Sequence, residues 1–483
     1  MLESFIESLK GRDLPAFLRA GLIGEGAPLE GPFGTRPLLY ADYVASGRAL
    51  RQVEDFVLDK VLPYYANSHT EASYCGAFCT RLREEARRSI AAIVGAGAGT
   101  SVVFAGSGAT AGINKIVRLL DIPGAVARGE KVVVFIGPYE HHSNILPWRE
   151  SGAELVDIPE SETGGPDLAA LEAALQASGE AVLRVGAFSA ASNVTGILAD
   201  IDAVTRLLKR HGALAVWDYA GGAPYLPMSM ADGSDAAKDA IVFSPHKFPG
   251  GPGATGILVI RESIIRISSP TAPGGGSVTF VSPWGHAYAG SLSVREEAGT
   301  PNVVGDIRAA LVLLIKQALG QGFIERRDVE LRERALAAWR GNPRIELLGR
   351  LDVPRLPIFS FRVRDGAGGY IHHQLFTRLL SDLWGIQARG GCACAGPYAH
   401  RLLDIDRDIS EAIFAAIRAG REVDRPGWVR LNFSYLMSDD SADRVIAAVD
   451  ELARRAGDHV TDYVFDPRTA RFRHKEELQR LEG

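Results

Sequence analysis

Cysteine is scarce in this chain, which has only 4 cysteines among 483 residues. So few thiols cannot form the disulfide framework of a small secreted protein, and they favour a reducing, cytoplasmic location. An excess of positive charge is also missing, since the formal net charge is -5, and nucleic acid is therefore not expected as a partner. The segment 1–14 contains several charged residues and hence no signal-peptide core.

Long apolar runs are missing as well. Two segments, 89–114 and 267–294, lack Asp, Glu, Lys and Arg, but Gly, Ser and Thr interrupt both of them. Neither segment is expected to span a membrane. The hydrophobic content of 46% and the charged content of 23% are typical of a soluble globular enzyme, and the length allows one large or two medium domains.

From Tyr40 to about Ile267, strand-like apolar runs alternate with helical patterns. The predicted helices include 80–94, 109–120, 167–176 and 201–211, and the predicted strands are 102–105, 131–136, 181–188, 214–217, 241–243 and 256–260. This alternation predicts an α/β fold with a mostly parallel, doubly wound sheet.

The pattern restarts after about residue 356 and predicts a smaller C-terminal α/β domain. Its expected elements are strands 358–363, 386–389 and 428–433 and helices 370–383 and 441–455. We expect a mobile Gly- and Ser-rich loop at 271–282 and two long bridging helices within 304–339. The predicted domains are an N-terminal helical segment 1–36, a large domain 37–303, bridging helices with the small domain 304–457, and a charged, only partly ordered tail 458–483.

The string Ser244-Pro245-His246-Lys247, followed by Gly250-Gly251-Pro252-Gly253, carries the clearest chemical signal. Enzymes that use pyridoxal 5'-phosphate (PLP) hold this cofactor as an imine on a lysine. They also need a hydroxyl for its phosphate and little bulk around its ring. The string therefore indicates Lys247 as that lysine, with Ser244 and His246 beside the cofactor, although most such strings are ordinary surface turns.

Other segments fit further atoms of the same cofactor. Strand 102–105 leads through Gly-rich backbone to Ala109 and Thr110, where a helix begins, and helix N-termini bind phosphate. Asp218 ends strand 214–217, at the sheet edge where α/β proteins bind ligands, and could keep the ring nitrogen protonated. A turn or helix-capping aspartate is the commoner use of such a residue.

Two more polar groups follow predicted strands. His141 lies after strand 131–136 and could stack on the cofactor ring, and Asn193 lies after strand 181–188 and could contact its phenolic oxygen. Five suitable groups thus occur in order, each at or soon after the carboxyl end of a strand. Their joint occurrence predicts a PLP site.

The set resembles the class V aminotransferase-fold PLP enzymes, which have the PLP-dependent transferase fold type I, and most closely the cysteine desulfurases and selenocysteine lyases. Residues 40–443 carry the matching strings, which are Tyr40-Ala41-Asp42, Asn67-Ser68-His69, Glu140-His141-His142-Ser143-Asn144-Ile145, Ser192-Asn193-Val194-Thr195-Gly196, Ser244-Pro245-His246-Lys247 and Glu297-Ala298-Gly299-Thr300-Pro301-Asn302.

This resemblance implies that the chain forms a homodimer with a shared active site, in which Thr300 reaches the cofactor phosphate of the partner subunit. It also implies the cofactor roles given above for Lys247, His141 and Asp218, with Asn193 facing both the phenolic oxygen and the substrate. Two positions depart from the family pattern: Gly221 stands where a glutamine is usual, and Ala109 stands where a threonine is usual.

The segment 389–397, Arg-Gly-Gly-Cys-Ala-Cys-Ala-Gly-Pro, resembles the loop of cysteine desulfurases that carries the nucleophile. The spacing implies Cys394 as this nucleophile, with Arg389 near the substrate carboxylate. A thiolate there could take sulfur from the substrate as a persulfide. Alternatively, Cys394 could simply be a small apolar side chain buried in the core. A third possibility is that it binds a metal together with Cys75, Cys79 and Cys392, although the spacings between these cysteines are unusual for a metal site.

Arg430 stands where the resembling enzymes bind the amino-acid carboxylate. The implied function is a PLP-dependent cysteine desulfurase that converts L-cysteine to L-alanine and passes sulfur to an acceptor protein; selenocysteine would fit the same site. The residues leave open another class V activity, such as an aminotransferase or a C–S lyase acting on a small amino acid. They also leave open a non-catalytic, metal-binding relative.

Overall fold

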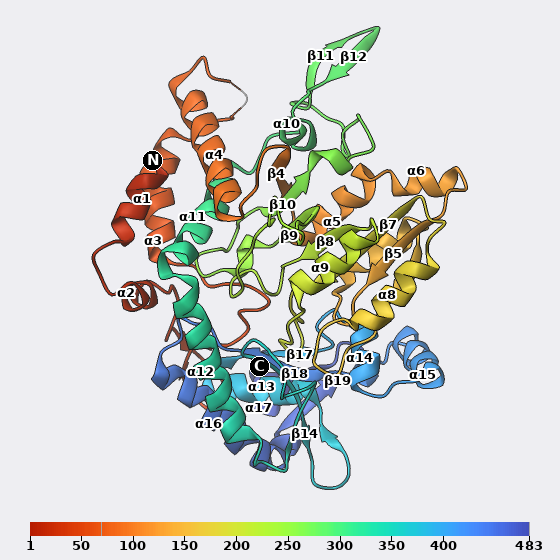
Figure 1. Cartoon of the computed structure of the whole chain (residues 1–483). Helices are drawn as coiled ribbons and strands as arrows, with labels where there is room; N and C mark the ends of the chain where they lie inside the picture. The colour runs from red at the N-terminus through yellow and green to blue at the C-terminus, as the bar shows by residue number, and fades with distance from the viewer. Residues whose placement is uncertain (69, 483) are drawn as a thin grey trace. The chain divides into compact units, whose positions relative to one another are not determined.

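The computed structural model describes residues 1–68 and 70–482 (Figure 1). His69, part of one string quoted above, lies outside the described residues. Packing divides the chain into two compact units. Unit 1 comprises Met1–Gly21, Ser46–Ser192 and Leu198–Phe323, and unit 2 comprises Leu22–Ala45, Asn193–Ile197 and Ile324 onward.

These units differ from the predicted domain ranges. The N-terminal segment is shared between the units, the first bridging helix belongs to unit 1, and the charged tail belongs to unit 2. Sequence patterns reveal elements in chain order, whereas units are set by which distant segments pack together.

Unit 1 contains a seven-stranded sheet with the order β4-β10-β9-β8-β7-β5-β6. Strands β5 to β9 run parallel, and β10 is antiparallel to both of its neighbours. The strands are β4 Thr100–Gly106, β5 Val132–Ile136, β6 Glu154–Asp157, β7 Leu183–Ser189, β8 Leu214–Asp218, β9 Ala240–Phe243 and β10 Gly256–Arg261. The predicted strands are confirmed to within two residues at each end; the short edge strand β6 was not predicted.

Helices cover both faces of this sheet. α5, Gly108–Leu119, packs with Val216 of β8 in one core cluster, whereas the next residue, Trp217, donates its indole N–H to Thr205 of α9, Ile201–Arg210, at 2.9 Å. Because neighbouring residues of a strand face opposite sides, the sheet is doubly wound as predicted.

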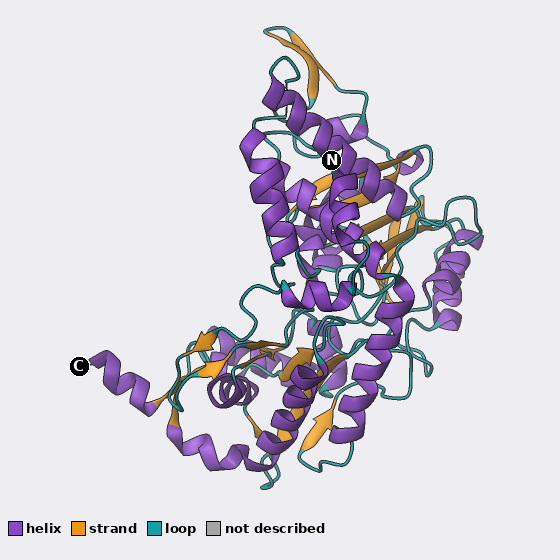
Figure 2. Cartoon of the chain, turned by 90° about the vertical axis from the view of Figure 1, so that its left-hand side faces the viewer, coloured by secondary structure: helices purple, strands orange, loops and turns teal. Residues whose placement is uncertain are grey.

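The other helices of unit 1 lie around this sheet. They are α1 Leu2–Leu9, α2 Leu14–Ala20, α3 Arg51–Phe56, α4 Tyr74–Ile93, α6 Ile122–Ala127, α7 Leu146–Glu150, α8 Leu168–Ala177, α10 Leu292–Glu296 and α11 Val303–Leu319. The segment 271–282 was expected to be a mobile loop, but its second half is strand β11, Val278–Ser282, which pairs with β12, Gly285–Tyr288. This hairpin projects from unit 1 (Figures 1 and 2). Trp284, between the two strands, is 93% exposed.

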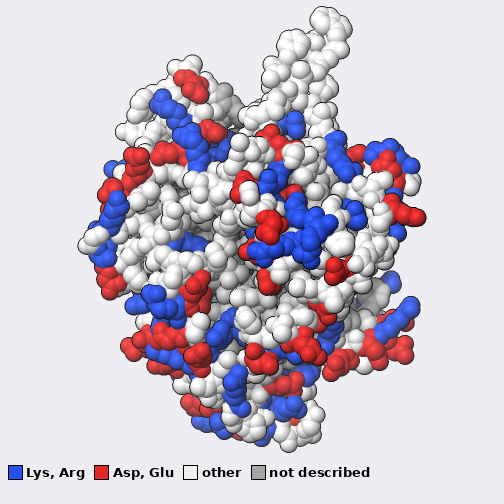
Figure 3. All heavy atoms as spheres, viewed as in Figure 1, with Lys and Arg blue, Asp and Glu red and all other residues white. Residues whose placement is uncertain are grey.

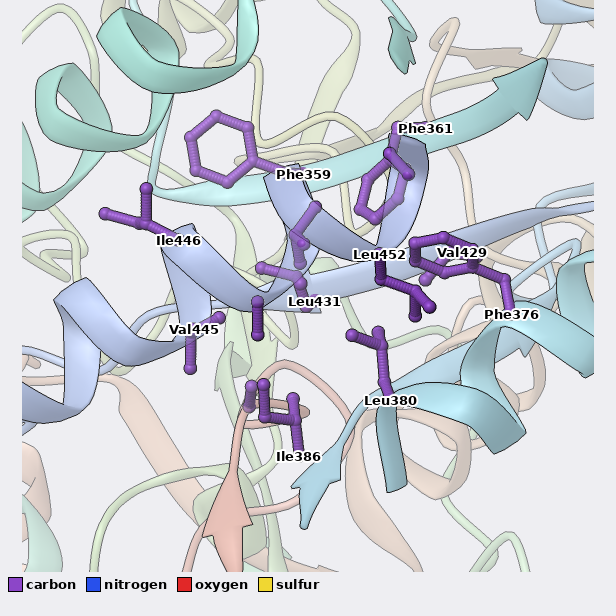
Figure 4. Packing of buried hydrophobic residues seen from close by; sticks show 14 of the residues in the cluster. Phe359, Phe361, Phe376, Leu380, Ile386, Val429, Leu431, Val445, Ile446 and Leu452 are labelled. Carbon is purple, nitrogen blue, oxygen red and sulfur yellow. The ribbon is translucent and has the colours of Figure 1, made fainter. Parts of the chain in front are cut away.

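Unit 2 is built on a largely antiparallel sheet with the order β13-β14-β18-β17. Its strands are β13 Ile345–Leu347, β14 Ile358–Arg364, β17 Arg389–Gly391 and β18 Trp428–Asn432, and β15 Tyr370–Ile371 also pairs with β14. α13, His373–Trp384, and α16, Asp439–Arg455, pack on it through an apolar core that includes Phe361, Phe376 and Leu452 (Figure 4).

Several smaller elements complete unit 2, together with α12 Gln321–Trp339, which begins at its border with unit 1. β16 Ile386–Gln387 pairs in parallel with β3 Leu39–Tyr40, and β1 Pro28–Leu29 pairs with β2 Arg36–Pro37. α14 Gly396–Leu402 and α15 Arg407–Arg418 were not predicted.

The tail is more regular than expected. β19 Tyr463–Asp466 and β20 Arg471–His474 form a hairpin, and α17 Lys475–Glu482 follows. Tyr463 is buried and donates its hydroxyl to Asp382 at 2.7 Å, so this segment packs on α13 despite its many charges.

The surface has no dominant charge on the face drawn in Figure 3, where acidic and basic side chains are interspersed. Among the described residues, no helix is both long and apolar enough to cross a membrane.

Candidate active site

The predicted phosphate turn lies where β4 ends and α5 begins. The backbone N–H of Ala109 donates to the hydroxyl of Ser244 at 2.9 Å. Gly108 has a φ of +61°, and a Cβ on it would lie 2.9 Å from Ser244 Oγ and 3.1 Å from His246 Cε1. Glycine therefore allows the helix N-terminus, the serine hydroxyl and the imidazole to come together around a space suited to an anion.

A chain of hydroxyls connects this turn with the predicted stacking histidine. Thr110 Oγ1 lies 2.7 Å from Ser143 Oγ, which lies 3.0 Å from Nδ1 of His141. The backbone N–H of Ser143 also donates to that Nδ1, at 3.1 Å. Since Nδ1 accepts a hydrogen bond, the His141 imidazole is neutral with its proton on Nε2.

Asp218 lies at the carboxyl end of β8 and is buried. Burial raises the pKa of its carboxyl group, and the N–H of Ala220, at 2.8 Å, and the charge of Lys247 oppose this rise. Lys247 is the last residue of a short 3-10 helix, Pro245–Lys247. The backbone N–H of Gly47 donates to the carbonyl of His246 at 2.9 Å and so holds this helix in place. A buried acid such as Asp218, in electrostatic contact with the amine of Lys247, is suited to bind a protonated ring nitrogen and to keep it protonated.

Sequence reasoning assigned no role to Glu140, although it lies in one of the quoted strings. Its buried carboxylate accepts hydrogen bonds from the backbone N–H of Ser189 at 2.8 Å, the Ser189 hydroxyl at 2.7 Å and the amide of Asn144 at 2.6 Å. It thereby ties the turn that carries His141 to the end of β7. Burial raises the pKa of Glu140 to about 7, the hydrogen bonds from Ser189 and Asn144 lower it, and the charge of Asp218 adds to the rise.

The Glu140 carboxyl group should make unit 1 less stable as the pH rises. Its pKa is raised from 4.5 to about 7 in the folded chain, so between these values the folded chain keeps a proton that the unfolded chain has lost. This stabilisation is fully present below the unfolded pKa and is lost as the pH rises to the folded pKa. Between about pH 5 and about pH 8, wild type should lose on the order of 3 kcal/mol more unfolding free energy than Glu140→Gln.

Denaturant unfolding of the cofactor-free protein at both pH values measures this difference. Glu150→Gln, which changes an exposed carboxylate of α7, should keep the pH dependence of wild type. Equal pH dependence in wild type and Glu140→Gln would show that Glu140 is ionised throughout.

The loop that carries Thr300 is anchored by a buried ion cluster. Glu297 accepts hydrogen bonds from Arg87 at 2.6 Å and from the backbone N–H of Phe104 at 2.8 Å, and it also pairs with Arg83. Arg83 bonds Asp306 of α11 at 2.6 Å. Thr300 itself is exposed.

The remaining predicted site residues lie together in unit 2. Arg389 and Arg430 are paired directly across β17 and β18. A buried carboxylate holds both, because Asp42 accepts from Arg430 Nη2 at 2.8 Å and from Arg389 Nε at 2.9 Å. Like charges opposite each other destabilise a sheet unless something neutralises them, which explains why Asp42 is placed here.

Arg430 also donates from Nη1 to the carbonyl of Asn193 at 3.1 Å. Burial lowers the pKa of its guanidinium, and the charges of Asp42 and Cys394 oppose that fall. The cluster of Arg389, Arg430 and Asp42 carries one excess positive charge, which suits it to bind one further carboxylate.

The nucleophile loop is a tight turn. The N–H of Ala395 donates to the carbonyl of Cys392 at 3.2 Å, and the two residues between them, Ala393 and Cys394, have φ values of 52° and 55°. Cys394 is exposed. The amide of Asn193 holds this turn by donating to the carbonyl of Ala393 at 2.9 Å, whereas Asn193 Oδ1 is a buried acceptor with no hydrogen-bond partner among the described residues.

The other two cysteines lie on α4. Cys79 is buried and contacts local backbone, since the N–H of Ala66 donates to its sulfur at 3.2 Å, while Cys75 is half-buried. Within the described part of the chain, no group of three or more His, Cys, Asp or Glu side chains is arranged to hold a metal ion.

The residues of unit 1 fit PLP. A helix N-terminus with Ser244 and His246 around a glycine suits its phosphate, a buried acid suits its ring nitrogen, and Lys247 interacts with that acid.

Comparison with known proteins decides the family. Residues 39–440 match the model of the class V aminotransferases. The chain belongs to the class V aminotransferase family. Proteins of this family use PLP, so the predicted family and cofactor are confirmed.

Relatives of this class V family member cover most of its length. A probable cysteine desulfurase of Vibrio cholerae serotype O1 is 31% identical over 421 residues, which are 86% of this chain and 93% of the relative. A cysteine desulfurase of Enterobacter sp. strain 638 is 30% identical over 366 residues, 75% of this chain and 85% of the relative.

Solved structures agree with the fold. A cysteine desulfurase from Thermococcus onnurineus NA1 has a TM-score of 0.75 and 23% identity, and the match covers 92% of this chain and 99% of that one. A cysteine desulfurase from Escherichia coli has a TM-score of 0.70 and 23% identity over 92% of this chain and 100% of that one. The predicted fold type I is thereby confirmed.

Proposed function

We propose that this chain is a PLP-dependent cysteine desulfurase that takes sulfur from L-cysteine and releases L-alanine. The observation that carries the proposal is an exposed thiol, Cys394, on a turn held by Asn193, in the same unit as an arginine pair suited to a carboxylate. The activity named for the relatives from Vibrio cholerae and Enterobacter supports the same function.

The residues of unit 1 bind the cofactor and move the proton. Ser244, Thr110, His246 and the amides at the start of α5 would hold the phosphate, and Asp218 would hold the ring nitrogen. When bound, PLP withdraws electrons from the substrate α-carbon and so makes its proton acidic. Lys247 takes that proton as a general base, and the imidazole of His141 would lie against the ring.

The residues of unit 2 hold the substrate and accept its sulfur. Arg389 and Arg430 bind the carboxylate of L-cysteine through their excess positive charge. The Cys394 thiolate attacks the substrate sulfur, the bond between that sulfur and Cβ breaks, and its electron pair passes to the carbon skeleton. A proton is then added at Cβ and Lys247 returns one to Cα, so that the skeleton leaves as L-alanine. Cys394 keeps the sulfur as a persulfide.

Asp42 positions the carboxylate anchor, so Asp42→Asn should weaken substrate binding. The change leaves two opposed guanidinium groups without their shared counter-charge, and Arg430 loses its fixed orientation. We expect the KM for L-cysteine to rise about tenfold with little change in kcat, and the variant to lose roughly 3 kcal/mol of stability. Steady-state kinetics and thermal unfolding measure the two effects.

Asp382→Asn is the matched control. Asp382 is also a buried carboxylate of unit 2 that holds an arginine, because it accepts from Arg378 Nε at 2.6 Å. That variant should lose stability and keep the KM of wild type. A KM that falls in Asp42→Asn would show instead that Asp42 competes with the substrate for Arg430.

Product analysis tests the proposed function itself. With L-cysteine and a thiol reductant, the PLP-loaded protein should release L-alanine and sulfide in equal amounts. Pyruvate with ammonia would identify a C–S lyase, and a requirement for a keto acid would identify an aminotransferase; either result would replace the proposal.

The assembly is part of the proposal. We expect a cytoplasmic homodimer in which Thr300 of each chain contacts the cofactor phosphate held by its partner, and a sulfur-acceptor protein that meets the exposed Cys394. The ion cluster around Glu297 supports this role, because it fixes the loop that presents Thr300.

A further inference from the structure

Cys392 is a second thiol in the nucleophile turn, and the proposed reaction does not use it. The turn begins at Cys392 and closes at Ala395, and both residues between them have left-handed backbone. This is the geometry of a type I′ turn, in which Asn and Gly are the usual residues. An alanine and a cysteine here cost about 1 kcal/mol or more each, so the fold imposes this bend against local preference.

The bend brings the backbones of the two cysteines close together. Left-handed backbone at Ala393 brings the α-carbons of Cys392 and Cys394 to roughly 5–6 Å, which is the separation at which two cysteine sulfurs can form a bond. A fully extended backbone would hold the same two α-carbons about 7 Å apart, at the upper limit for a sulfur–sulfur bond. The turn therefore allows sulfur to pass between the two residues.

The surroundings of Cys392 differ from those of Cys394. Cys392 is half-buried whereas Cys394 is exposed. Arg425 donates two hydrogen bonds to Glu422, at 2.8 and 2.9 Å. These bonds are the main cause that raises the pKa of Arg425, and the charge of Cys392 raises that pKa further. The Cys392 sulfur thus lies within electrostatic reach of a guanidinium that Glu422 holds in place.

Close backbone packing keeps Cys392 beside this arginine. Gly391 pairs with Trp428 across β17 and β18, and a Cβ on Gly427 would lie 2.9 Å from the carbonyl carbon of Gly391. Because glycine removes that side chain, the strand end before Cys392 packs against the segment that follows Arg425.

We infer that Cys392 is a second sulfur-carrying residue, which takes the sulfane sulfur from the Cys394 persulfide. This inference rests on the proposed desulfurase function. The Cys392 thiolate attacks the outer sulfur of the persulfide, the sulfur–sulfur bond at Cys394 breaks, and Cys394 leaves as a thiolate while the new persulfide forms on Cys392. One sulfur–sulfur bond forms as another breaks, so the transfer needs no oxidant or reductant.

The transfer restores Cys394 while the sulfur stays on the enzyme. One chain can then process a second molecule of L-cysteine before any acceptor or reductant removes the first sulfur. The half-buried position of Cys392 keeps the stored sulfur less accessible to water and small thiols than it would be on Cys394.

A titration of the PLP-loaded enzyme without reductant tests this inference. Given two equivalents of L-cysteine per chain, wild type should form two equivalents of L-alanine, and its alkylated loop peptide should carry two sulfane sulfurs, one on each cysteine. Cys392→Ser should form half as much L-alanine and carry one sulfur, on Cys394. Cys75→Ser, which removes a half-buried thiol of α4, should behave as wild type.

Fragment masses of the wild-type peptide locate the sulfur without relying on a variant, and Cys392→Ala repeats the test if the serine variant folds poorly. The inference is wrong if wild type stops at one L-alanine with all sulfur on Cys394, or if both Cys392 variants still form two. If wild type forms no L-alanine at all, the proposed function fails and this inference fails with it.

Discussion

Replacing Cys394 by serine should abolish sulfide release from L-cysteine, lowering kcat by about 10⁴-fold or more. A serine hydroxyl is not ionised at neutral pH and cannot carry sulfane sulfur. The backbone turn should survive, because the carbonyls of Ala393 and Cys392 accept the hydrogen bonds that hold it and the side chain of residue 394 takes part in neither. Sulfide and L-alanine assays with the PLP-loaded variant measure the loss.

Cys75→Ser is the control for thiol number, and it should retain wild-type kcat. The variant at 394 should also bind PLP as wild type does, since none of the residues that would hold the cofactor phosphate contains its sulfur. Stoichiometric L-alanine and sulfide from Cys394→Ser would contradict a persulfide on this residue and would move the chemistry elsewhere.

Replacing Lys247 by alanine should lower kcat by about 10⁴-fold or more, because the variant lacks both the base that moves the α-proton and the amine that attaches the cofactor. The variant should lose every activity that requires removal of the proton from the substrate α-carbon. Lys131→Ala removes a lysine that pairs with Glu154 at the surface, and it should leave kcat unchanged. Turnover in Lys247→Ala close to that of wild type would exclude Lys247 as the base.

The strands and the residues at their carboxyl ends were predictable because hydrophobic periodicity and short motifs depend only on neighbouring residues in the sequence. Strand β8 and the aspartate that ends it, for instance, follow from a short apolar run bounded by a polar residue, and the parallel sheet then places Asp218 at the ligand edge. Ser244 and Ala109 were likewise predicted as members of one phosphate site, and the structure joins them by a hydrogen bond.

The carboxylates that organise the site were not predictable in the same way. Asp42 is far from Arg389 and Arg430 in sequence, so nothing local shows that one carboxylate holds both. Glu140 adjoins a predicted site residue, yet its role depends on Ser189 at the end of another strand. One signal could have identified Asp42 and Glu140: each lies in a string that matches the family, and neither had been given a role.

The turn at the nucleophile was hidden for a different reason. Alanine and cysteine have no preference for left-handed backbone, so the sequence 392–395 gives no local sign of a type I′ turn. The order of the tail could not be decided from its charges, because it depends on the buried hydrogen bond between Tyr463 and Asp382.

Borohydride reduction of the PLP-loaded protein, followed by peptide mass mapping, tests the account most directly. The peptide that contains Lys247 should gain the mass of the reduced cofactor, and no other lysine-containing peptide should. Asp218→Ala should weaken cofactor retention. An unmodified Lys247, or a cofactor attached stoichiometrically to another lysine, would contradict the account.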